Sequence, residues 1–361
     1  MNRSFRRARI YLAAIAVATV PLAAAAPAIA VEAVGHVYVQ TNHAAGNSVV
    51  SYARAADGTL TYEETVPTGG LGLGAGLGSQ AAVAITDDGG RLLAVNAGSD
   101  DVSLFEVTPN GLELADVRPV GDRPVSVDVH GSIVYVLNQG ADTIQGVRIT
   151  EEGTLAKVPH SVRPLSGAGV AAAQVAFSPD GRLLAVTEKA TQTIDTFRVR
   201  PNGRAIGPKA QASVGATPFG FEFGPDGRLF VSEAPTSSAS SYDVAADGTI
   251  DVITASLANG GGAACWLVVS PDGRFAYTAN ATSDDVSRYG IAADGSLTLE
   301  AGTAGETDPG PVDLDVTEDA LYVLNSRSGS ISAFAVGSDG SLTPIAGASG
   351  FAAGRAGLVA V

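Results

Sequence analysis

A chain of 361 residues, 45% of them hydrophobic, can bury one large core or the cores of two or three smaller domains. The formal net charge of −15 argues against the basic surface that nucleic-acid binding requires, so we expect no nucleic-acid partner. The 44 glycines and the 6% share of aromatic residues are typical of a turn-rich β-protein.

Residues 1–30 have the pattern of a secretory signal peptide. Four arginines precede an apolar run over residues 10–26, and small residues at 28–30 offer a cleavage point. Pro21 interrupts the run and Pro27 follows it, which argues against a membrane anchor, and we expect no membrane span in the mature chain. Cleavage lowers the number of basic residues from 22 to 18 against 37 acidic residues, a formal net charge of −19. We therefore expect a secreted or otherwise extracytoplasmic protein.

The single cysteine, Cys265, excludes an intrachain disulfide. Stability must therefore come from packing and from the closure of sheets. Because Cys265 lies beside Trp266 in an apolar run, we expect its thiol to be buried and inert rather than nucleophilic.

A turn of the Asp-Gly type recurs along the chain at intervals of 42 to 53 residues. Its copies are Asp57-Gly58, Asn110-Gly111, Glu152-Gly153, Asn202-Gly203, Asp247-Gly248, Asp294-Gly295 and Asp339-Gly340. A period of this length with several short strands predicts the blades of a propeller. Each repeat also contains a second turn, which is of the Pro-Asp-Gly type in the copy at residues 271–273. The two turns divide every unit into four strands, a to d.

Six complete repeats begin with strand a near Ala81, Pro124, Ala173, Pro218, Ala264 and Pro311. The first repeat begins late, at strand b over residues 36–41, and residues 357–361 supply its missing strand a. The sequence therefore predicts an all-β fold over residues 31–361. This fold is a seven-bladed β-propeller with four-stranded blades, in which the C-terminal strand pairs in blade 1 and closes the ring. We expect a monomer.

The repeated turns, and stretches such as SPDGRLLAVTEKATQTIDTFRV at residues 178–199, resemble the lactonase-like seven-bladed propellers. These include 6-phosphogluconolactonase and carboxymuconate-lactonising enzymes. The resemblance covers nearly the whole mature chain and implies a hydrolase-like protein that acts on a small lactone. The fold alone does not determine the activity, because one fold hosts many functions.

Catalytic members of that family carry an Arg-His pair in strand a and an Asn-Glu pair at the end of strand b. Here Ala173-Gln174 and Glu188-Lys189 stand at those positions, and no blade supplies the histidine. The chain looks more like a secreted branch in which other motifs replace the histidine and the arginine. Those motifs are Gly78-Ser79-Gln80, Pro218-Phe219-Gly220-Phe221 and Cys265-Trp266.

Strand a lines the channel of a propeller, and its side chains alternate between two faces. One parity of strand a is apolar, so the opposite parity is expected to face the channel: Ser126, Asp128, Gln174, Glu222, Trp266, Asp313 and Asp315. Four carboxylates in a narrow channel repel one another, which raises their pKa values or recruits a cation. The candidate ligands of a divalent cation, the one candidate cofactor, are Asp128, Glu222, Asp313 and Asp315. The alternative is that water alone hydrates these acids.

The b–c turns and the d–a loops share one face of the ring, here called the rim face. That face carries a polar residue at or just after the end of each strand b: Asn42, Asn96, Asn138, Glu188, Glu233, Asn280 and Asn325. Asparagine at such a position is usually local turn chemistry. Glu188 and Glu233 replace it in neighbouring blades, which suggests a ligand.

Two functions are compatible with these patterns. The first is hydrolysis of a small sugar lactone or muconolactone at the channel mouth, with Glu222, Glu188 or Glu233 as the general base that activates water. The small-molecule ligand would contact Gln80, Asp128, Gln174, Trp266 and Asp313. The missing Arg-His pair leaves no obvious group to stabilise an oxyanion. The second function is a non-catalytic extracellular propeller that binds a ligand or a protein on the rim face. The absence of basic clusters disfavours phosphorylated substrates.

Overall fold

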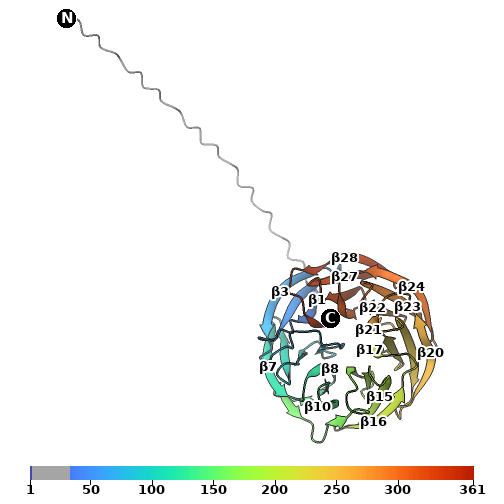
Figure 1. Ribbon diagram of the computed structural model, residues 1–361. Helices are drawn as coiled ribbons and strands as arrows, with labels where there is room; N and C mark the ends of the chain where they lie inside the picture. The colour runs from blue at the N-terminus through green and yellow to red at the C-terminus, as the bar shows by residue number, and fades with distance from the viewer. Residues whose placement is uncertain (2–32) are drawn as a thin grey trace. The chain divides into compact units, whose positions relative to one another are not determined.

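The computed structural model describes Met1 and residues 33–361. The predicted signal peptide falls on residues outside this described part. Residues 33–361 form seven antiparallel sheets that follow one another around a ring (Figure 1). The prediction of an all-β, seven-bladed propeller is therefore confirmed. In the part of the chain that the structure describes, no helix has the length and apolar character needed to cross a membrane.

Strand a of the repeat is the innermost strand of six blades. These inner strands are β4 (Val83–Ile85), β8 (Pro124–His130), β13 (Ala172–Phe177), β17 (Pro218–Phe223), β21 (Ala264–Val269) and β25 (Pro311–Val316). The second strands are β1 (Ala33–Gln40), β5 (Arg91–Asn96), β9 (Ile133–Asn138), β14 (Leu183–Glu188), β18 (Leu229–Glu233), β22 (Phe275–Asn280) and β26 (Ala320–Asn325).

The two outer strands of each blade form a hairpin. The third strands are β2 (Ser48–Ala55), β6 (Asp101–Thr108), β10 (Thr143–Ile149), β15 (Thr193–Val199), β19 (Ser238–Val244), β23 (Asp285–Ile291) and β27 (Ser330–Val336). The outermost strands are β3 (Leu60–Pro67), β7 (Gly111–Pro119), β11 (Leu155–Lys157), β16 (Ala205–Ala212), β20 (Ile250–Ala258), β24 (Leu297–Glu306) and β28 (Leu342–Ser349). Blade 3 carries the additional short strand β12 (Arg163–Pro164), which pairs with β10.

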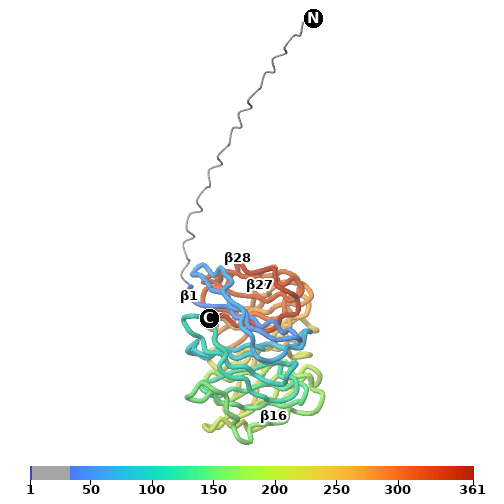
Figure 2. Tube along the Cα trace, turned by 90° about the vertical axis from the view of Figure 1, so that its left-hand side faces the viewer, coloured from blue at the N-terminus to red at the C-terminus, as the bar shows by residue number. Residues whose placement is uncertain are grey.

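The C-terminal strand β29 (Ala356–Ala360) closes the ring as predicted. It pairs antiparallel with β1, so that the sheet order of blade 1 is β29-β1-β2-β3. In both views the first blade, in blue, lies beside the last, in red (Figures 1 and 2). Closure pairs the inner edge of blade 1, which would otherwise be an open template for another chain.

The turns of the Asp-Gly type all connect the third and fourth strands of a blade. The glycine of each has a positive φ, between 75° and 115°, a conformation that favours glycine. Three of these glycines also accept a hydrogen bond from a second-strand tyrosine of the preceding blade. The donor hydroxyls are those of Tyr135, Tyr277 and Tyr322, which bond the carbonyls of Gly203, Gly340 and Gly58 at 2.8–2.9 Å. The repeated turn therefore also docks one blade onto the next.

Candidate functional site

A β-bulge near the start of strand a sets which side chains face the channel. The pairing register of strands a and b shifts immediately before Ser126 in β8, Gln174 in β13 and Asp313 in β25. A bulge inserts one extra residue and so re-aims the side chains that follow it. After the bulge the side chains alternate regularly between the two faces of the strand. Asp128 therefore lies on the same face as Ser126, and Asp315 on the same face as Asp313.

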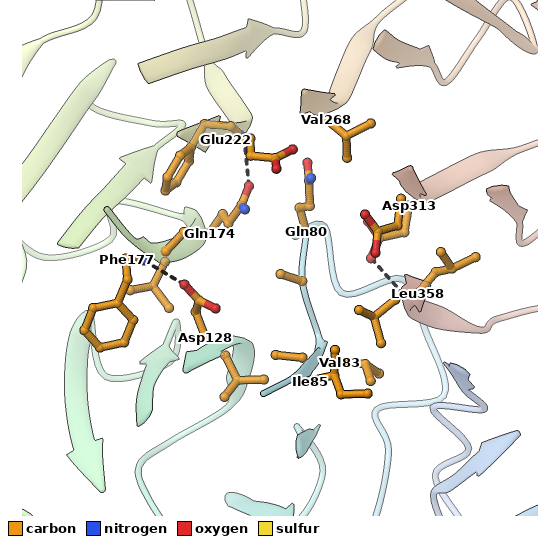
Figure 3. A pocket seen from close by; sticks show the side chains of 18 of the residues that line it. Gln80, Val83, Ile85, Asp128, Gln174, Phe177, Glu222, Val268, Asp313 and Leu358 are labelled. Carbon is orange, nitrogen blue, oxygen red and sulfur yellow. Dashed lines mark hydrogen bonds between the residues drawn. The ribbon is translucent and has the colours of Figure 1, made fainter. Parts of the chain in front are cut away.

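A cavity of about 340 Å³ lies in the channel (Figure 3). Its polar lining consists of Gln80, Asp128, Gln174, Glu222, Asp313 and Asp315. The remaining wall is largely apolar and includes Val83, Ile85, Phe177, Phe223, Val268, Leu358 and Val359. The structure therefore brings Gln80 together with the four acids and Gln174, which were expected to face the channel from strand parity.

Each of the four acids accepts a backbone N–H from the inner strand of the next blade. The pairs are Asp128 with Phe177 (2.7 Å), Glu222 with Val269 (2.6 Å), Asp313 with Leu358 (3.2 Å) and Asp315 with Ala360 (2.8 Å). An inner strand has no strand neighbour on its channel side, so its N–H groups need side-chain or water partners. Each of the four acids therefore links its own blade to the next one by a hydrogen bond.

Burial raises the pKa of all four channel acids. It raises the pKa of Asp128 and of Asp315 to about 6, and that of Asp313 well above its usual range. The pKa of Glu222 rises to about 8, first because of burial and then because the charges of Asp315 and Asp128 oppose its ionisation. Near neutral pH, Glu222 therefore has a greater tendency than Asp128 to stay protonated.

The four acids do not gather around one point. Within the described part of the chain, no three His, Cys, Asp or Glu side chains form a group that could hold a metal ion. The sequence suggested that Asp128, Glu222, Asp313 and Asp315 hold a cation together. In the described channel these side chains do not form such a cluster of ligands. The neutral state of Glu222 offers another way to reduce the repulsion.

The segment that precedes β4 crosses the channel and closes its rim end. The Gln80 side chain donates to Leu267 O (2.8 Å) and accepts from Leu267 N (3.1 Å) on the opposite side of the ring. The neighbouring Ser79 accepts the indole N–H of Trp266 at 2.9 Å and donates its hydroxyl to Val125 O at 2.8 Å. We call residues 78–81 the plug.

Trp266 lies outside the cavity lining, although strand parity placed it in the channel. Its ring packs edge-on against Phe219, with the ring centroids 5.3 Å apart. The plug passes so close to blade 5 that a Cβ on Gly220 would lie 1.9 Å from the Gln80 Oε1 atom. Residues of the Gly78-Ser79-Gln80, Pro218-Phe219-Gly220-Phe221 and Cys265-Trp266 motifs therefore meet in one place, where they build the plug.

Exposure increases along the channel from the plug to the face that carries the a–b turns. Gln80 and Gln174 are each 5% exposed and Asp313 is 1% exposed. Asp128 and Glu222, which lie further along strand a, are only half-buried. Pro179 of an a–b turn also lines the cavity. The cavity therefore opens towards the a–b turns rather than towards the rim face.

Glu188 and Glu233 lie at the ends of β14 and β18, are fully buried and are not part of the cavity lining. Glu233 accepts hydrogen bonds from the hydroxyls of Ser238 and Ser240. Glu188 accepts hydrogen bonds from the backbone N–H and the hydroxyl of Ser166 and from the hydroxyl of Thr191. The structure thus does not bring these two acids together with Glu222.

Sequence reasoning missed Asp195, the third residue of β15. Its side chain is fully buried beside Glu188. The equivalent position is serine in four other blades: Ser103, Ser240, Ser287 and Ser332. Comparison of the repeats at this position, rather than at the end of strand b alone, would have revealed the substitution.

Comparison with known proteins agrees with the fold. The family model described as "Lactonase, 7-bladed beta-propeller" matches residues 36–167 and 246–360, more than half of the chain. Two uncharacterised proteins of Lactococcus lactis are each 25% identical over 134 and 169 residues, which are 34% and 43% of this chain. These alignments span 38% and 48% of the two relatives.

Solved structures match over a larger part of the chain. The periplasmic gluconolactonase of Pseudomonas aeruginosa superposes with a TM-score of 0.70 at 18% identity, over 91% of this chain and 99% of that one. A protein of Lactobacillus plantarum gives a TM-score of 0.74 at 18% identity, over the same shares of the two chains. At this identity the likeness shows the fold alone, whereas the family follows from the matching model. The chain belongs to the lactonase family of seven-bladed β-propellers.

Proposed function

We propose that this protein hydrolyses a small, uncharged lactone in the channel cavity. One arrangement carries the proposal: Asp128 and Glu222 line the same cavity, and burial raises the pKa of Asp128 to about 6 and that of Glu222 to about 8. Environments that separate two acids in this way supply one base and one acid at the same pH. Glu222 is then the neutral partner, and we assign the role of general base to Asp128. Asp315, which lines the same cavity and whose pKa burial also raises to about 6, is the alternative base.

The reaction needs both groups. The Asp128 carboxylate takes a proton from water, and the water oxygen bonds to the lactone carbonyl carbon. The neutral Glu222 carboxyl donates a hydrogen bond to the carbonyl oxygen as negative charge develops there, which replaces the donor lost with the Arg-His pair. The bond from the carbonyl carbon to the ring oxygen then breaks, and the ring oxygen takes the proton from Asp128. The product is the open-chain hydroxy acid.

The cavity lining favours an uncharged substrate with an apolar side. It contains no lysine, arginine or histidine to bind a phosphate or a carboxylate. Its volume is at the lower end of the range for small-molecule sites. The name of the Pseudomonas aeruginosa gluconolactonase supports a sugar lactone as the first substrate to test.

Hydrolysis of a panel of lactones by the purified protein tests the proposal. Asp128→Asn and Glu222→Gln should each lower kcat/KM by about 10²- to 10⁴-fold, the usual contribution of a general acid or base. Glu64→Gln is the matched control, because Glu64 also accepts a backbone N–H from the next blade (Leu112, 2.6 Å) but does not line the cavity. Activity that is insensitive to both channel variants would contradict the proposal.

Binding without turnover is the second candidate function. It is favoured by the hydrogen bonds of the channel acids, since each acid is already explained as a link between blades. Calorimetric titration with the same lactones distinguishes the two functions. Heat of binding without product formation would establish a binding protein, and product formation would establish the hydrolase.

A further inference from the structure

The last residue of strand b meets the first and third residues of strand c in the same way in several blades. In blade 2, the Asn96 amide donates to Asp101 at 2.6 Å and to Ser103 at 2.7 Å. In blade 6, Asn280 makes the corresponding two bonds at 2.5 and 2.8 Å. In blade 5, Glu233 replaces the asparagine, and serine hydroxyls supply the donors instead. In each of these blades a donor faces an acceptor.

Blade 4 breaks this rule, because Glu188 faces Asp195. Both side chains are fully buried, and within the described residues neither Asp195 Oδ1 nor Oδ2 has a hydrogen-bond partner. Glu188 receives its hydrogen bonds from Ser166 and Thr191, not from a cationic side chain. Among the described residues, no salt bridge involves Glu188 or Asp195. Two acids without a compensating charge are costly to bury.

We propose that a bound cation of the Ca²⁺ class lies between Glu188 and Asp195. The two carboxylates and the hydroxyls of Ser166 and Thr191 present up to six oxygen atoms, the ligand type and number that Ca²⁺ takes. A proton shared between the two carboxyl groups is the competing arrangement, and the calcium titration described below distinguishes it from a bound cation.

The site has a route to solvent. Ser166 and Thr191 are exposed residues above the two buried carboxyl groups, and the loop over residues 167–169 beside them is also exposed. The site lies at the rim-face end of blade 4, where Ser166 belongs to the d–a loop that arrives from blade 3. A cation there would fasten this loop to β14. It is separate from the channel cavity and does not depend on lactone hydrolysis.

Calcium titration of the full chain after treatment with a chelator tests this site. At pH 7, calorimetry should show one Ca²⁺ bound per chain, and saturating Ca²⁺ should raise the Tm by about 2–5 °C. The double variant Glu188→Asn/Asp195→Ser gives blade 4 the residues that blade 6 has at these positions, and it should fold and lose the calcium response. Asp128→Asn, a channel variant, should keep it.

Asp195→Asn is the conservative second variant, in case the double variant does not fold. It retains the shape of the side chain and should weaken Ca²⁺ binding at least tenfold. Wild-type protein that shows neither binding heat nor a Tm shift with Ca²⁺ would overturn the proposal, and the pair would then share a proton. A calcium response that persists unchanged in Asp195→Asn would overturn it equally.

Discussion

Asp128 combines two roles that a substitution can separate. Its carboxylate accepts N–H groups from Val129 (2.8 Å) and from Phe177 of the next blade (2.7 Å), and the same carboxylate lines the cavity. The two N–H groups bond to different oxygens, so asparagine retains an acceptor for the Phe177 bond between blades and loses the one for Val129, and it cannot act as a base at neutral pH. Alanine removes both functions. The residue therefore distinguishes a structural from a chemical contribution.

We expect Asp128→Ala to lower the free energy of unfolding by about 1–3 kcal/mol relative to wild type, because it leaves buried N–H groups without an acceptor. Asp128→Asn should lose less than about 1 kcal/mol. Urea denaturation of the three proteins measures the difference. Equal stability of the two variants would show that the link between blades contributes nothing.

At the scale of the strand and loop, the plug accounts for the three motifs around Gln80, Gly220 and Trp266. Gln80 reaches across the ring to Leu267, and Ser79 holds the Trp266 indole. Gly220 allows this approach because it has no Cβ. The plug closes the rim end of the channel, so the cavity opens at the a–b turns.

Gly220→Ala should therefore displace the plug. The new Cβ would lie 1.9 Å from Gln80 Oε1 and 2.9 Å from Cys265 O, so we expect a loss of about 2 kcal/mol or more in the free energy of unfolding. Gly76→Ala is the control, because no atom lies within 4 Å of a Cβ there. Thermal unfolding of both variants tests the contact, and an unaltered Tm for Gly220→Ala would contradict the closed geometry.

At the scale of the whole molecule, the buried acids couple stability to pH. The folded pKa values of Asp128, Asp315 and Glu222 are raised, so the folded state binds more protons than the unfolded state between about pH 4 and pH 8. The free energy of unfolding therefore decreases as pH rises through this window. The stability that these acids contribute is thus fully present in acid and is lost as pH approaches 8. The formal net charge of −15 at pH 7 acts in the same direction.

We expect the Tm at pH 5 to exceed the Tm at pH 8.5 by roughly 5 °C. The double variant Asp128→Asn/Glu222→Gln should reduce this difference, because two of the groups responsible no longer titrate. Differential scanning calorimetry at constant ionic strength measures both values. A Tm that rises from pH 5 to pH 8.5 would contradict the raised pKa values.

The sequence was sufficient to predict the architecture because the repeat is local. Turn glycines such as Gly295 recur at a regular spacing, and strand β25 begins at Pro311 as predicted. Strand parity likewise predicted that Asp128 and Glu222 face the channel. Both inferences depend on neighbours in the chain, where periodicity is informative.

The plug and the Glu188–Asp195 pair could not be predicted in this way. Gln80 and Leu267 are 187 residues apart, and no repeat relates them, so their contact depends on closure of the ring. Trp266 does not line the cavity, because its ring packs against Phe219 and its indole N–H donates to Ser79 of the plug. The pKa of Glu222 depends on burial and on charges from other blades, which a sequence pattern does not carry.

The pH dependence of lactone hydrolysis tests the central claim most directly. If Asp128 acts ionised and Glu222 acts neutral, kcat/KM should rise with a pKa near 6, fall with a pKa near 8 and reach its maximum near pH 7. Glu222→Gln should remove the alkaline limb, since the amide does not titrate. A profile that keeps rising above pH 8 in the wild-type protein would contradict the account.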